Sequence, residues 1–347
     1  MGRPRVAVLF GGRSEEHDVS VKSAMGIAAH IDDQRWAPFY VGITRAGAWM
    51  LCDRPDPDWE LGDCRPAVLS PDTATHGLVA LDGAEPRVVH VDAVFPVLHG
   101  RFGEDGAVQG LLELSGIPYV GCDVQSSALC MDKALAHTVA RTAGIATPRL
   151  CVLHADRADG VRSVATDLAF PVFVKPARSG SSFGVTRVER ADDLDAAIAE
   201  AQRYDDKVVV EQAIVGTEVG CAVLGDGSEL TVGEVDQITL SHGFFRIHQE
   251  ERPEAGSENA TVTVPADVPD HVRDEIRGTA KAVYAALGCR GLARVDMFLT
   301  PDGRIVLNEV NTLPGFTAYS RYPRMMAAAG LPLSDVIDRC LSLAMGR

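Results

Sequence analysis

A short apolar strand, two glycines and an amphipathic helix follow one another at the start of the chain. The segment "RVAVLF" (5–10) has the uninterrupted apolar run of a buried strand, and apolar residues recur at helical spacing over 24–31, with Ser20 as the predicted N-cap. A second strand at 92–98 precedes a helix that Gly116 ends. Strands that alternate with helices predict a parallel α/β layout, in which ligands bind at the carboxyl ends of the strands.

The pattern changes near residue 126. A helix at 131–144 is followed by strand-like segments on both sides of a second helix at 191–204, which predicts an α+β unit with an antiparallel sheet. Beyond it we expect a helix at 273–288 and a β-hairpin at 291–311. The chain is thus divided into three predicted domains, 1–125, 126–217 and 218–347.

The composition excludes several classes of protein. A formal net charge of −15 argues against a nucleic-acid partner, because such binding depends on Lys and Arg at the phosphates. No apolar run approaches the roughly 20 residues of a membrane span, and the first strand is too short for a signal-peptide core, so we expect a cytoplasmic protein without a membrane partner. The eight cysteines contain no C-x-x-C pair, and we expect them to be reduced and mostly buried rather than bridged or bound to zinc.

A loop rich in glycine and serine, "KPARSGSSFGV" (175–185), lies between two predicted strands. Small residues let backbone N–H groups approach an anion, and Lys175 adds positive charge, so the segment is typical of a phosphate-binding loop. It lacks the G-x-x-x-x-G-K-[ST] spacing of a P-loop, and an ordinary hairpin is the alternative. Lys133, near the start of its predicted helix, is a weaker signal, because a lone surface lysine is usually solvated.

The hairpin at 291–311 allows its register to be predicted. Its turn, "TPDG", fits a type I turn in which Thr300 faces Gly303. Because side chains alternate between the faces of a strand, four polar side chains then project to one side: Arg294, Asp296, Glu309 and Asn311. Two carboxylates and an amide oxygen suit Mg²⁺ that bridges nucleotide phosphates. The alternative is a solvated face with an ion pair between Arg294 and Glu309.

A long segment without helical or strand periodicity, "SHGFFRIHQEERPEAGSEN" (241–259), separates two predicted strands. It contains His242, Arg246 and His248, and loops longer than about 12–15 residues are usually functional or disordered. Elsewhere, "GGRSEEH" has two adjacent glycines but not the G-x-G-x-x-G of a dinucleotide site, so NAD is not expected. His99 follows the end of a predicted strand, where a core histidine and a ligand-binding histidine are both consistent with the sequence.

Six stretches of the chain resemble, in order, the motifs of the D-alanine/D-alanine ligases of the ATP-grasp superfamily: "LFGGRSEEHDVS", "FPVLHGRFGEDGAVQGLLELSGIPYVG", "MDKALA", "VKPARSGSSFGV", "ARVDMF" and "NEVNTLPGFT". The resemblance covers almost the whole chain. It implies an α/β and α+β protein with the ATP-grasp fold, in which an N-terminal Rossmann-like (pre-ATP-grasp) parallel-sheet domain precedes two α+β domains that sandwich ATP.

Two further stretches, "SHGFFRIHQE" and "YSRYP", resemble the vancomycin-resistance branch of that family, whose VanA-type ligases make D-alanyl-D-lactate. Typical dipeptide ligases carry a Tyr in this loop, usually preceded by a Lys, and a Leu where this chain has Arg321. The resemblance leaves open which residue replaces the loop lysine, with Arg246 as a candidate.

The resemblance implies that ATP binds together with two Mg²⁺ or Mn²⁺ ions. The phosphates would lie beside Lys133 and Lys175, beneath a flexible cover formed by the 180–184 loop, which includes Ser182. The adenine and ribose would contact Glu211, Ile214 and Glu218. The metal ligands would be Asp296, Glu309 and Asn311.

The resemblance also implies how the first substrate reacts. Glu16 would bind the ammonium group of D-alanine, with Ser181 orienting Glu16 and His99 nearby. The carboxylate of D-alanine would attack the γ-phosphate of ATP and form an acyl phosphate. Arg294 and the backbone N–H of Gly315 would then form an oxyanion hole when a second substrate attacks the acyl carbon.

For the second substrate, Ser320 would hold the carboxylate, with three further residues as helpers: Lys22, Tyr319 and Arg321. The omega loop at 237–259 would close as a lid that excludes water, and His248 would lie beside the acceptor and favour D-lactate. The expected partners are D-alanine, D-lactate and a second copy of the chain in a homodimer. A plain D-alanine/D-alanine ligase is the alternative enzyme, and a nucleotide-binding regulatory module without catalysis is the alternative class.

Overall fold

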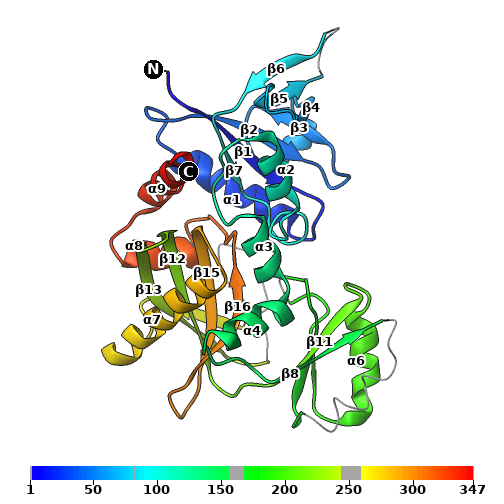
Figure 1. The fold of residues 1–347 in the computed structure, drawn as a ribbon, viewed down its shortest axis with the longest axis vertical. Helices are drawn as coiled ribbons and strands as arrows, with labels where there is room; N and C mark the ends of the chain where they lie inside the picture. The colour runs from blue at the N-terminus through cyan, green and yellow to red at the C-terminus, as the bar shows by residue number, and fades with distance from the viewer. Residues whose placement is uncertain are drawn as a thin grey trace.

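The computed structural model describes residues 2–81, 83, 85–155, 168–180, 182–243 and 259–346. Its strands form three sheets of seven, four and five strands. The seven-stranded sheet lies at the top of Figure 1, the five-stranded sheet below it on the left, and the four-stranded sheet at the lower right. Each sheet draws its strands from one predicted domain, apart from the first residue of one strand at Thr217, and the boundaries at 125 and 217 themselves stay a prediction.

The N-terminal sheet has the strand order β6-β5-β4-β3-β2-β1-β7. Its strands are β1 (Arg5–Gly11), β2 (Ala37–Ile43), β3 (Trp49–Cys52), β4 (Arg65–Leu69), β5 (Gly77–Ala80), β6 (Arg87–His90) and β7 (Ala93–Pro96). The predicted parallel arrangement is confirmed where β1 pairs with β2 and β7. It is wrong for β2 to β6, which pair antiparallel in chain order, because connections as short as 44–48 leave no room for the crossover that parallel strands need.

Strand β1 is buried on both faces. Val6, Val8 and Phe10 belong to one apolar core, whereas Ala7 and Leu9 belong to another on the opposite side of the sheet. This is the alternation that a strand requires when helices cover both faces of its sheet. The helices of this part are α1 (His17–His30), the short 3₁₀ helix η1 (Trp59–Leu61), α2 (Ala107–Ser115) and α3 (Val124–Met131).

Helix α1 begins before the predicted N-cap. Glu16 is the residue that precedes its first turn, and Ser20 lies inside the helix, so the predicted cap is wrong. The Ser20 hydroxyl is instead buried against the strand ends, where it accepts from the Gly11 N–H at 2.9 Å and donates to the Val97 carbonyl oxygen. The predicted end of α2 is confirmed, because Gly116 has the left-handed φ of +67° typical of a helix C-cap.

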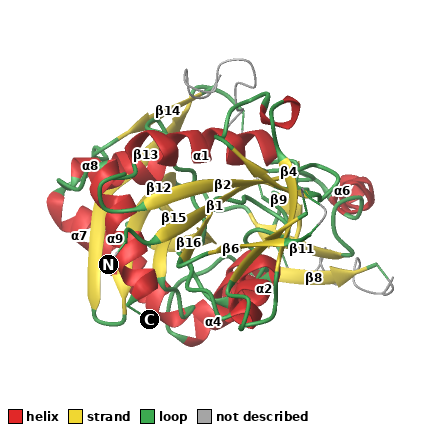
Figure 2. Cartoon of the chain, turned by 90° about the horizontal axis from the view of Figure 1, so that it is seen from above, coloured by secondary structure: helices red, strands yellow, loops and turns green. Residues whose placement is uncertain are grey.

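The four-stranded sheet has the order β10-β9-β11-β8, and its pairs are antiparallel as predicted. Its strands are β8 (Leu150–His154), β9 (Val172–Pro176), β10 (Thr186–Val188) and β11 (Lys207–Gln212). The helices near it are α4 (Lys133–Thr142), the 3₁₀ helix η2 (Ala191–Asp193) and α6 (Leu194–Ala201). Helix α6 packs on one face of this sheet, on the right of Figure 2, and closes a separate apolar core.

The five-stranded sheet has the order β14-β13-β12-β15-β16 and is antiparallel throughout. Its strands are β12 (Thr217–Asp226), β13 (Glu229–Leu240), β14 (Ala260–Thr263), β15 (Gly291–Leu299) and β16 (Ile305–Asn311). The helices of this part are α7 (Asp270–Ala286), α8 (Arg321–Ala328) and α9 (Leu333–Met345). No helix in the described ranges is both long and apolar enough to cross a membrane.

The register of the β15–β16 hairpin differs from the prediction by one residue beside the turn and by two residues at the polar positions. Gly303 has a φ of +84° and adds a residue to the turn, so the Thr300 N–H pairs with the Arg304 carbonyl at 2.9 Å, and a second irregularity follows Asp296. Asp296 therefore faces Glu309, and the alternative interpretation, an ion pair of Arg294 with Glu309, is wrong, because Arg294 pairs with Asp296. Because side chains alternate, a shift of two residues still leaves the four predicted polar side chains on one face.

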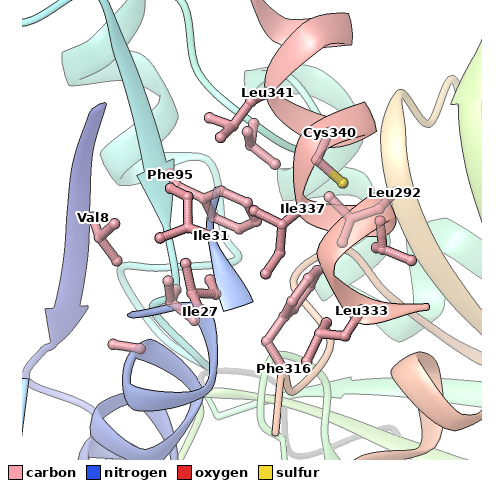
Figure 3. Packing of buried hydrophobic residues seen from close by; sticks show 14 of the residues in the cluster. Val8, Ile27, Ile31, Phe95, Leu292, Phe316, Leu333, Ile337, Cys340 and Leu341 are labelled. Carbon is pink, nitrogen blue, oxygen red and sulfur yellow. The ribbon is translucent and has the colours of Figure 1, made fainter. Parts of the chain in front are cut away.

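The last two helices belong to the core of the N-terminal part. Figure 3 shows Ile337 of α9 and Phe316 packed among Val8, Ile27 and Phe95 from the N-terminal sheet and α1. A polar contact supports this packing, since Trp36 donates its indole N–H to Asp338 at 3.0 Å. The C-terminal helices therefore complete the apolar core to which the first strand belongs.

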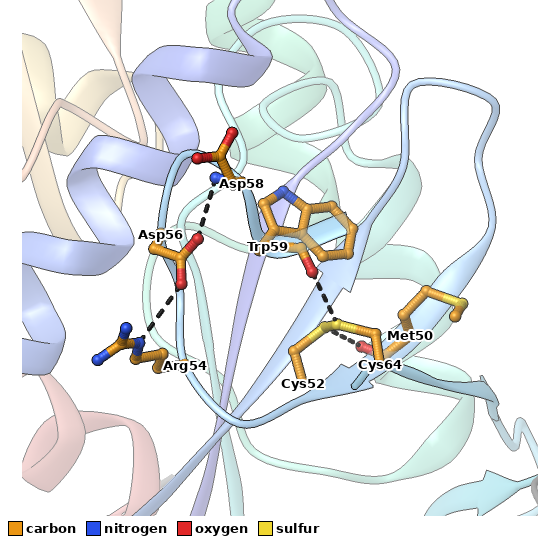
Figure 4. Close-up of a disulfide and its surroundings, with 7 residues drawn as sticks. All are labelled: Met50, Cys52, Arg54, Asp56, Asp58, Trp59 and Cys64. Carbon is orange, nitrogen blue, oxygen red and sulfur yellow. Dashed lines mark hydrogen bonds and ion pairs between the residues drawn. A yellow bond between two sulfur atoms is a disulfide. The ribbon is translucent and has the colours of Figure 1, made fainter. Parts of the chain in front are cut away.

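Two of the eight cysteines are joined, contrary to our expectation. Cys52 ends β3, Cys64 directly precedes β4, and the two form a disulfide with a Cα–Cα distance of 4.5 Å (Figure 4). The pair lies one step beyond the Leu51–Arg65 pair of the β3–β4 ladder. Sequence spacing gave no sign of it, because this proximity depends on the pairing of two strands that are separated by a loop.

Candidate active site

The predicted metal face of the hairpin is a network of opposite charges. The Asp296 carboxylate is buried, and it accepts from Arg294 Nη2 at 2.7 Å and from Asn311 Nδ2 at 3.0 Å. Glu309 lies 3.4 Å from the Lys133 ammonium, measured from Oε2 to Nζ. Burial alone would raise the pKa of Asp296, but Arg294 and Arg321 hold it below its ordinary value. Asp296 is therefore kept ionised.

Arg321 lies at the centre of this network. Its Nε and Nη2 atoms donate to the two oxygens of Asp236 at 2.7 and 2.8 Å, and Nη1 lies 3.2 Å from both Glu218 and Asp296. Gly220 makes the space for it, because a Cβ atom there would lie 2.4 Å from Arg321 Nη2. Burial raises the pKa of Glu218 to about 6, although the Arg321 charge opposes that shift.

Two predicted phosphate-binding lysines lie on α4 and on the four-stranded sheet. Lys133 is the first residue of α4, and its ammonium donates to the Ser179 carbonyl at 2.7 Å. Lys175 forms a buried ion pair with Glu211 across the β9–β11 ladder. The second oxygen of that carboxylate, Glu211 Oε2, is buried and has no hydrogen-bond partner within the described ranges. It is an acceptor available to a ligand.

Glu16 lies between two glycine-containing loops. Cβ atoms added to Gly100 and Gly180 would lie 2.6 and 2.8 Å from Glu16 Oε2, so side chains at either position would collide with the carboxylate. One glycine follows the N-terminal sheet and the other belongs to the predicted phosphate loop. The carboxylate thus lies where these two regions of the molecule meet.

His99 is a buried histidine with both ring nitrogens bonded. Nδ1 donates to the Leu313 carbonyl at 2.8 Å, and Nε2 lies 3.0 Å from Ser23 Oγ. Burial lowers its pKa, although Glu16 opposes the shift, so the ring is neutral and Nε2 accepts from the serine hydroxyl. The ring connects the N-terminal sheet to the segment that follows β16.

The predicted acceptor residues lie around the start of α8. Ser320 is the N-cap residue of α8, its hydroxyl lies 2.6 Å from Thr317 Oγ1, and a Cβ on Gly315 would lie 2.8 Å from Ser320 Oγ. Tyr319 is 39% exposed, and Lys22 is half-buried on α1, so both side chains are accessible to a ligand. Arg321, by contrast, is committed to the three carboxylates described above.

The structure gives little information about five of the predicted site residues. Ser181, Arg246 and His248 lie outside the described residues. Ser182 is exposed with a left-handed φ of +60°, and Ile214 is half-buried just beyond β11. The contacts above join Lys133 to Glu309, and Arg321 to Glu218 and Asp296.

Sequence reasoning missed three residues that organise this site. Asp236 is fully buried, and the one signal for it was a carboxylate at an inward position of an apolar strand. Glu104 has a pKa raised to about 7, chiefly by burial and then by the charge of Glu16. Ser23, one residue after the predicted Lys22, faces inward from α1 and had no distinguishing signal.

Comparisons with known proteins agree with this geometry. Residues 5–122 match the family model described as D-ala D-ala ligase N-terminus, and residues 139–342 match the model described as D-ala D-ala ligase C-terminus. The three sheets are those of the ATP-grasp fold, and the matching family is one of ATP-dependent ligases. The chain belongs to the D-alanine/D-alanine ligase family, and the resemblance seen in its sequence is confirmed.

Three similar proteins cover the chain almost completely. A putative D-alanine–D-lactate ligase of Streptomyces coelicolor is 66% identical over 99% of both chains. The vancomycin/teicoplanin A-type resistance protein VanA of Enterococcus faecium is 61% identical over 99% of both chains. The crystal structure of the VanG D-Ala:D-Ser ligase from Enterococcus faecalis has a TM-score of 0.90 at 41% identity, and covers 99% of this chain and 100% of its own.

Proposed function

We propose that this protein joins D-alanine to D-lactate at the expense of ATP, which gives D-alanyl-D-lactate for modified peptidoglycan precursors and thereby vancomycin resistance. The observation that carries the proposal is the 66% identity to the Streptomyces coelicolor protein over nearly the whole chain. The histidine-containing loop at 241–259 supports it, because typical dipeptide ligases carry a tyrosine there. An ordinary D-alanine/D-alanine ligase is the second candidate, since both reactions need the same first half.

In the first half-reaction, the two lysines act on the phosphates of ATP. A protein with a net charge of −15 needs local positive charge to bind an anion, and Lys133 and Lys175 supply it. The 180–184 loop covers the phosphates. The orphaned oxygen of Glu211 accepts from the adenine amino group, with Ile214 against the ring and Glu218 beside the ribose. The D-alanine carboxylate then takes the γ-phosphoryl group, a transfer that depends on positioning and charge neutralisation.

Divalent metal ions fit the donor set of the hairpin. Glu309, Asp296 and Asn311 offer hard oxygen atoms on neighbouring strands, which suits Mg²⁺ or Mn²⁺, and two ions are expected. The described residues contain no group of three or more His, Cys, Asp or Glu side chains arranged for a metal, in line with a set of two carboxylates and one amide. Bound metal would neutralise the charge of the phosphates.

In the second half-reaction, the acceptor attacks the acyl carbon. Glu16 holds the ammonium of the first D-alanine and Ser181 orients that carboxylate. Arg294 and the Gly315 N–H stabilise the oxyanion that forms. Ser320, with Lys22 and Tyr319 beside it, holds the acceptor's carboxylate.

The three predicted domains divide this work. Residues 1–125 bind the first D-alanine, whereas the domains at 126–217 and 218–347 enclose ATP. Because the reaction consumes ATP, we propose that it occurs in the cytoplasm. We also propose that the active protein is a homodimer.

The acceptor is selected by its charge. D-Lactate carries a net negative charge, whereas D-alanine carries an ammonium group that must lose a proton before it attacks. A protonated His248 about 5 Å from that group would interact by roughly 3 kcal/mol at an effective dielectric of 20, before screening is considered. It attracts the lactate anion and opposes the ammonium, so D-lactate is favoured at neutral pH.

The test is a competition between D-lactate and D-alanine as acceptors at several pH values. A histidine has an ordinary pKa of about 6.5, so the wild-type product should change from depsipeptide to dipeptide as the pH rises. Because the D-alanine amine titrates in the same direction, His248→Ala is the necessary comparison. Its depsipeptide yield should fall at pH 6 to 7, while its dipeptide yield at high pH is retained. Equal product ratios for the two proteins at every pH would remove His248 as the selector.

A further inference from the structure

The segment 313–316, directly after β16, is held by three side chains of the N-terminal region. Glu104 Oε1 accepts from the Leu313 N–H at 3.1 Å, and His99 Nδ1 donates to the Leu313 carbonyl at 2.8 Å. At the other end of the segment, Ser23 Oγ accepts from the Phe316 N–H at 3.2 Å. His99 also connects the two ends, because its Nε2 lies 3.0 Å from the Ser23 hydroxyl.

These contacts leave one N–H of the segment for a ligand. Pro314 has no N–H, and those of Leu313 and Phe316 are bonded to Glu104 and Ser23. The Gly315 N–H makes no hydrogen bond to any described residue. The segment is therefore fixed at both ends around a single free donor.

Glu104 also connects this donor to the site of the first substrate. Its other oxygen, Oε2, accepts from the Gly100 N–H at 2.8 Å, and a Cβ on Gly100 would touch the Glu16 carboxylate. One carboxylate thus binds the backbone on both sides of the reaction centre. When Glu104 is ionised, above its raised pKa of about 7, two N–H groups on one carboxylate form charge-assisted bonds, which are stronger and more directional than neutral ones.

We propose that Glu104 is a positioning residue, which fixes the Gly315 N–H relative to Glu16 so that acceptor attack outpaces hydrolysis of the acyl phosphate. This inference rests on the proposed function. An oxyanion donor must lie within about 2.7–3.1 Å of the developing oxygen, and a displacement of about 1 Å costs on the order of 10²-fold in rate.

The effect is specific to the second half-reaction. The Gly315 N–H stabilises the oxygen that becomes negative when the acceptor attacks the acyl carbon, and no such oxyanion forms while the γ-phosphoryl group is transferred. If acceptor attack slows, water attacks the acyl phosphate instead, the bond to phosphate breaks, and D-alanine and inorganic phosphate are released. ADP then forms without ligated product.

The experiment measures ADP and total ligated product, depsipeptide plus dipeptide, in the same samples of purified Glu104→Gln protein. Glutamine keeps the size of the side chain but places an NH₂ group against one of the two N–H donors. The ratio of ADP to product should be about one in wild type, and we expect it to be several-fold higher in Glu104→Gln. Asp105→Asn is the matched control, because among the described residues Asp105 binds only N–H groups near its own loop, those of Phe102 and Ala107, and its ratio should stay near one.

A residue that only stabilised the fold would lower ADP and product together. A ratio near one in Glu104→Gln at reduced overall rate would therefore overturn the inference. Ser23→Ala is the second variant, because it removes the hydrogen bond that holds the other end of the segment. It should also raise the ratio of ADP to product. If Glu104→Gln folds poorly, this variant still tests the inference, and a ratio near one would overturn it. A wild-type protein that releases no ADP in response to D-alanine would overturn the proposed function, and the inference with it.

Discussion

The buried charged side chains around Arg321 are matched by opposite charges. Arg321 binds Asp236 through two nitrogens, and its third nitrogen reaches toward Glu218 and Asp296. Taking these groups out of water is costly, and the cost is tolerated where each charge finds a partner with good geometry. The same reasoning explains why Glu309, which is one third exposed, pairs with Lys133.

At this scale we predict that Glu309→Gln nearly abolishes ligation while the fold is retained. Glu309 is partly exposed, so the substitution disturbs no packed core, but a neutral amide binds a divalent cation and positions Lys133 far less well than a carboxylate. Turnover should be measured against Mg²⁺ concentration, together with the melting temperature. Near-normal turnover at ordinary Mg²⁺ would exclude Glu309 as a metal ligand.

Strand β12 shows how one element makes room for the site. It is the central strand of the five-stranded sheet, and Gly220 on it pairs with Asp236 on one side and Asp296 on the other. The Arg321 guanidinium crosses the face of the strand at this glycine. A Cβ atom would lie 2.4 Å from Arg321 and 2.7 and 2.9 Å from the two carboxylates. The missing side chain therefore creates the space in which the charges meet.

Gly220→Ala should destabilise the protein by about 1–3 kcal/mol and weaken nucleotide binding, because the added methyl displaces Arg321 from its carboxylates. Gly278→Ala is the matched control. That glycine lies within α7, and an added Cβ has nothing within 4 Å, so the change should be neutral or stabilise the helix by up to about 1 kcal/mol. Chemical denaturation and nucleotide titration of both variants would check this. Equal effects of the two substitutions would contradict the crowding argument.

At the scale of the whole molecule, the two ends of the chain share one core. Helix α9 packs against the N-terminal sheet and α1 (Figure 3), while the four-stranded sheet has a core built from its own strands and α6. The three tryptophans, at 36, 49 and 59, all lie in the N-terminal region. Their fluorescence should therefore report on the last helix as well, although it is almost 300 residues further along the chain.

Ile337→Ala should move the tryptophan-detected unfolding transition to lower denaturant, with a loss of about 2–5 kcal/mol, because it leaves a cavity beside Phe95. Val174→Ala is the control, since Val174 is equally buried but belongs to the separate core of the four-stranded sheet. It should leave the tryptophan transition nearly unchanged. Equal shifts for both variants would show that the two cores unfold as one unit.

The local pattern of the sequence was sufficient for much of this protein. Apolar periodicity, glycines and turn residues predicted β1, α2, α4, α7 and the β15–β16 hairpin, since these signals act over a few residues. Alternation put Asp296, Glu309 and Asn311 on one face even though the register was two residues off. The family resemblance supplied the class of enzyme, and that class is confirmed.

The tertiary structure alone decided which distant residues meet. Asp236 binds Arg321 across 85 positions of sequence, and Glu104 binds Leu313 across 209. Cys52 pairs with Cys64 because two strands align, and β3 to β6 pair antiparallel because their connections are short. Hydrophobic periodicity indicates which face of an element a side chain occupies. Which distant residues come into contact depends on how the sheets and helices pack, and this packing is determined by the whole chain.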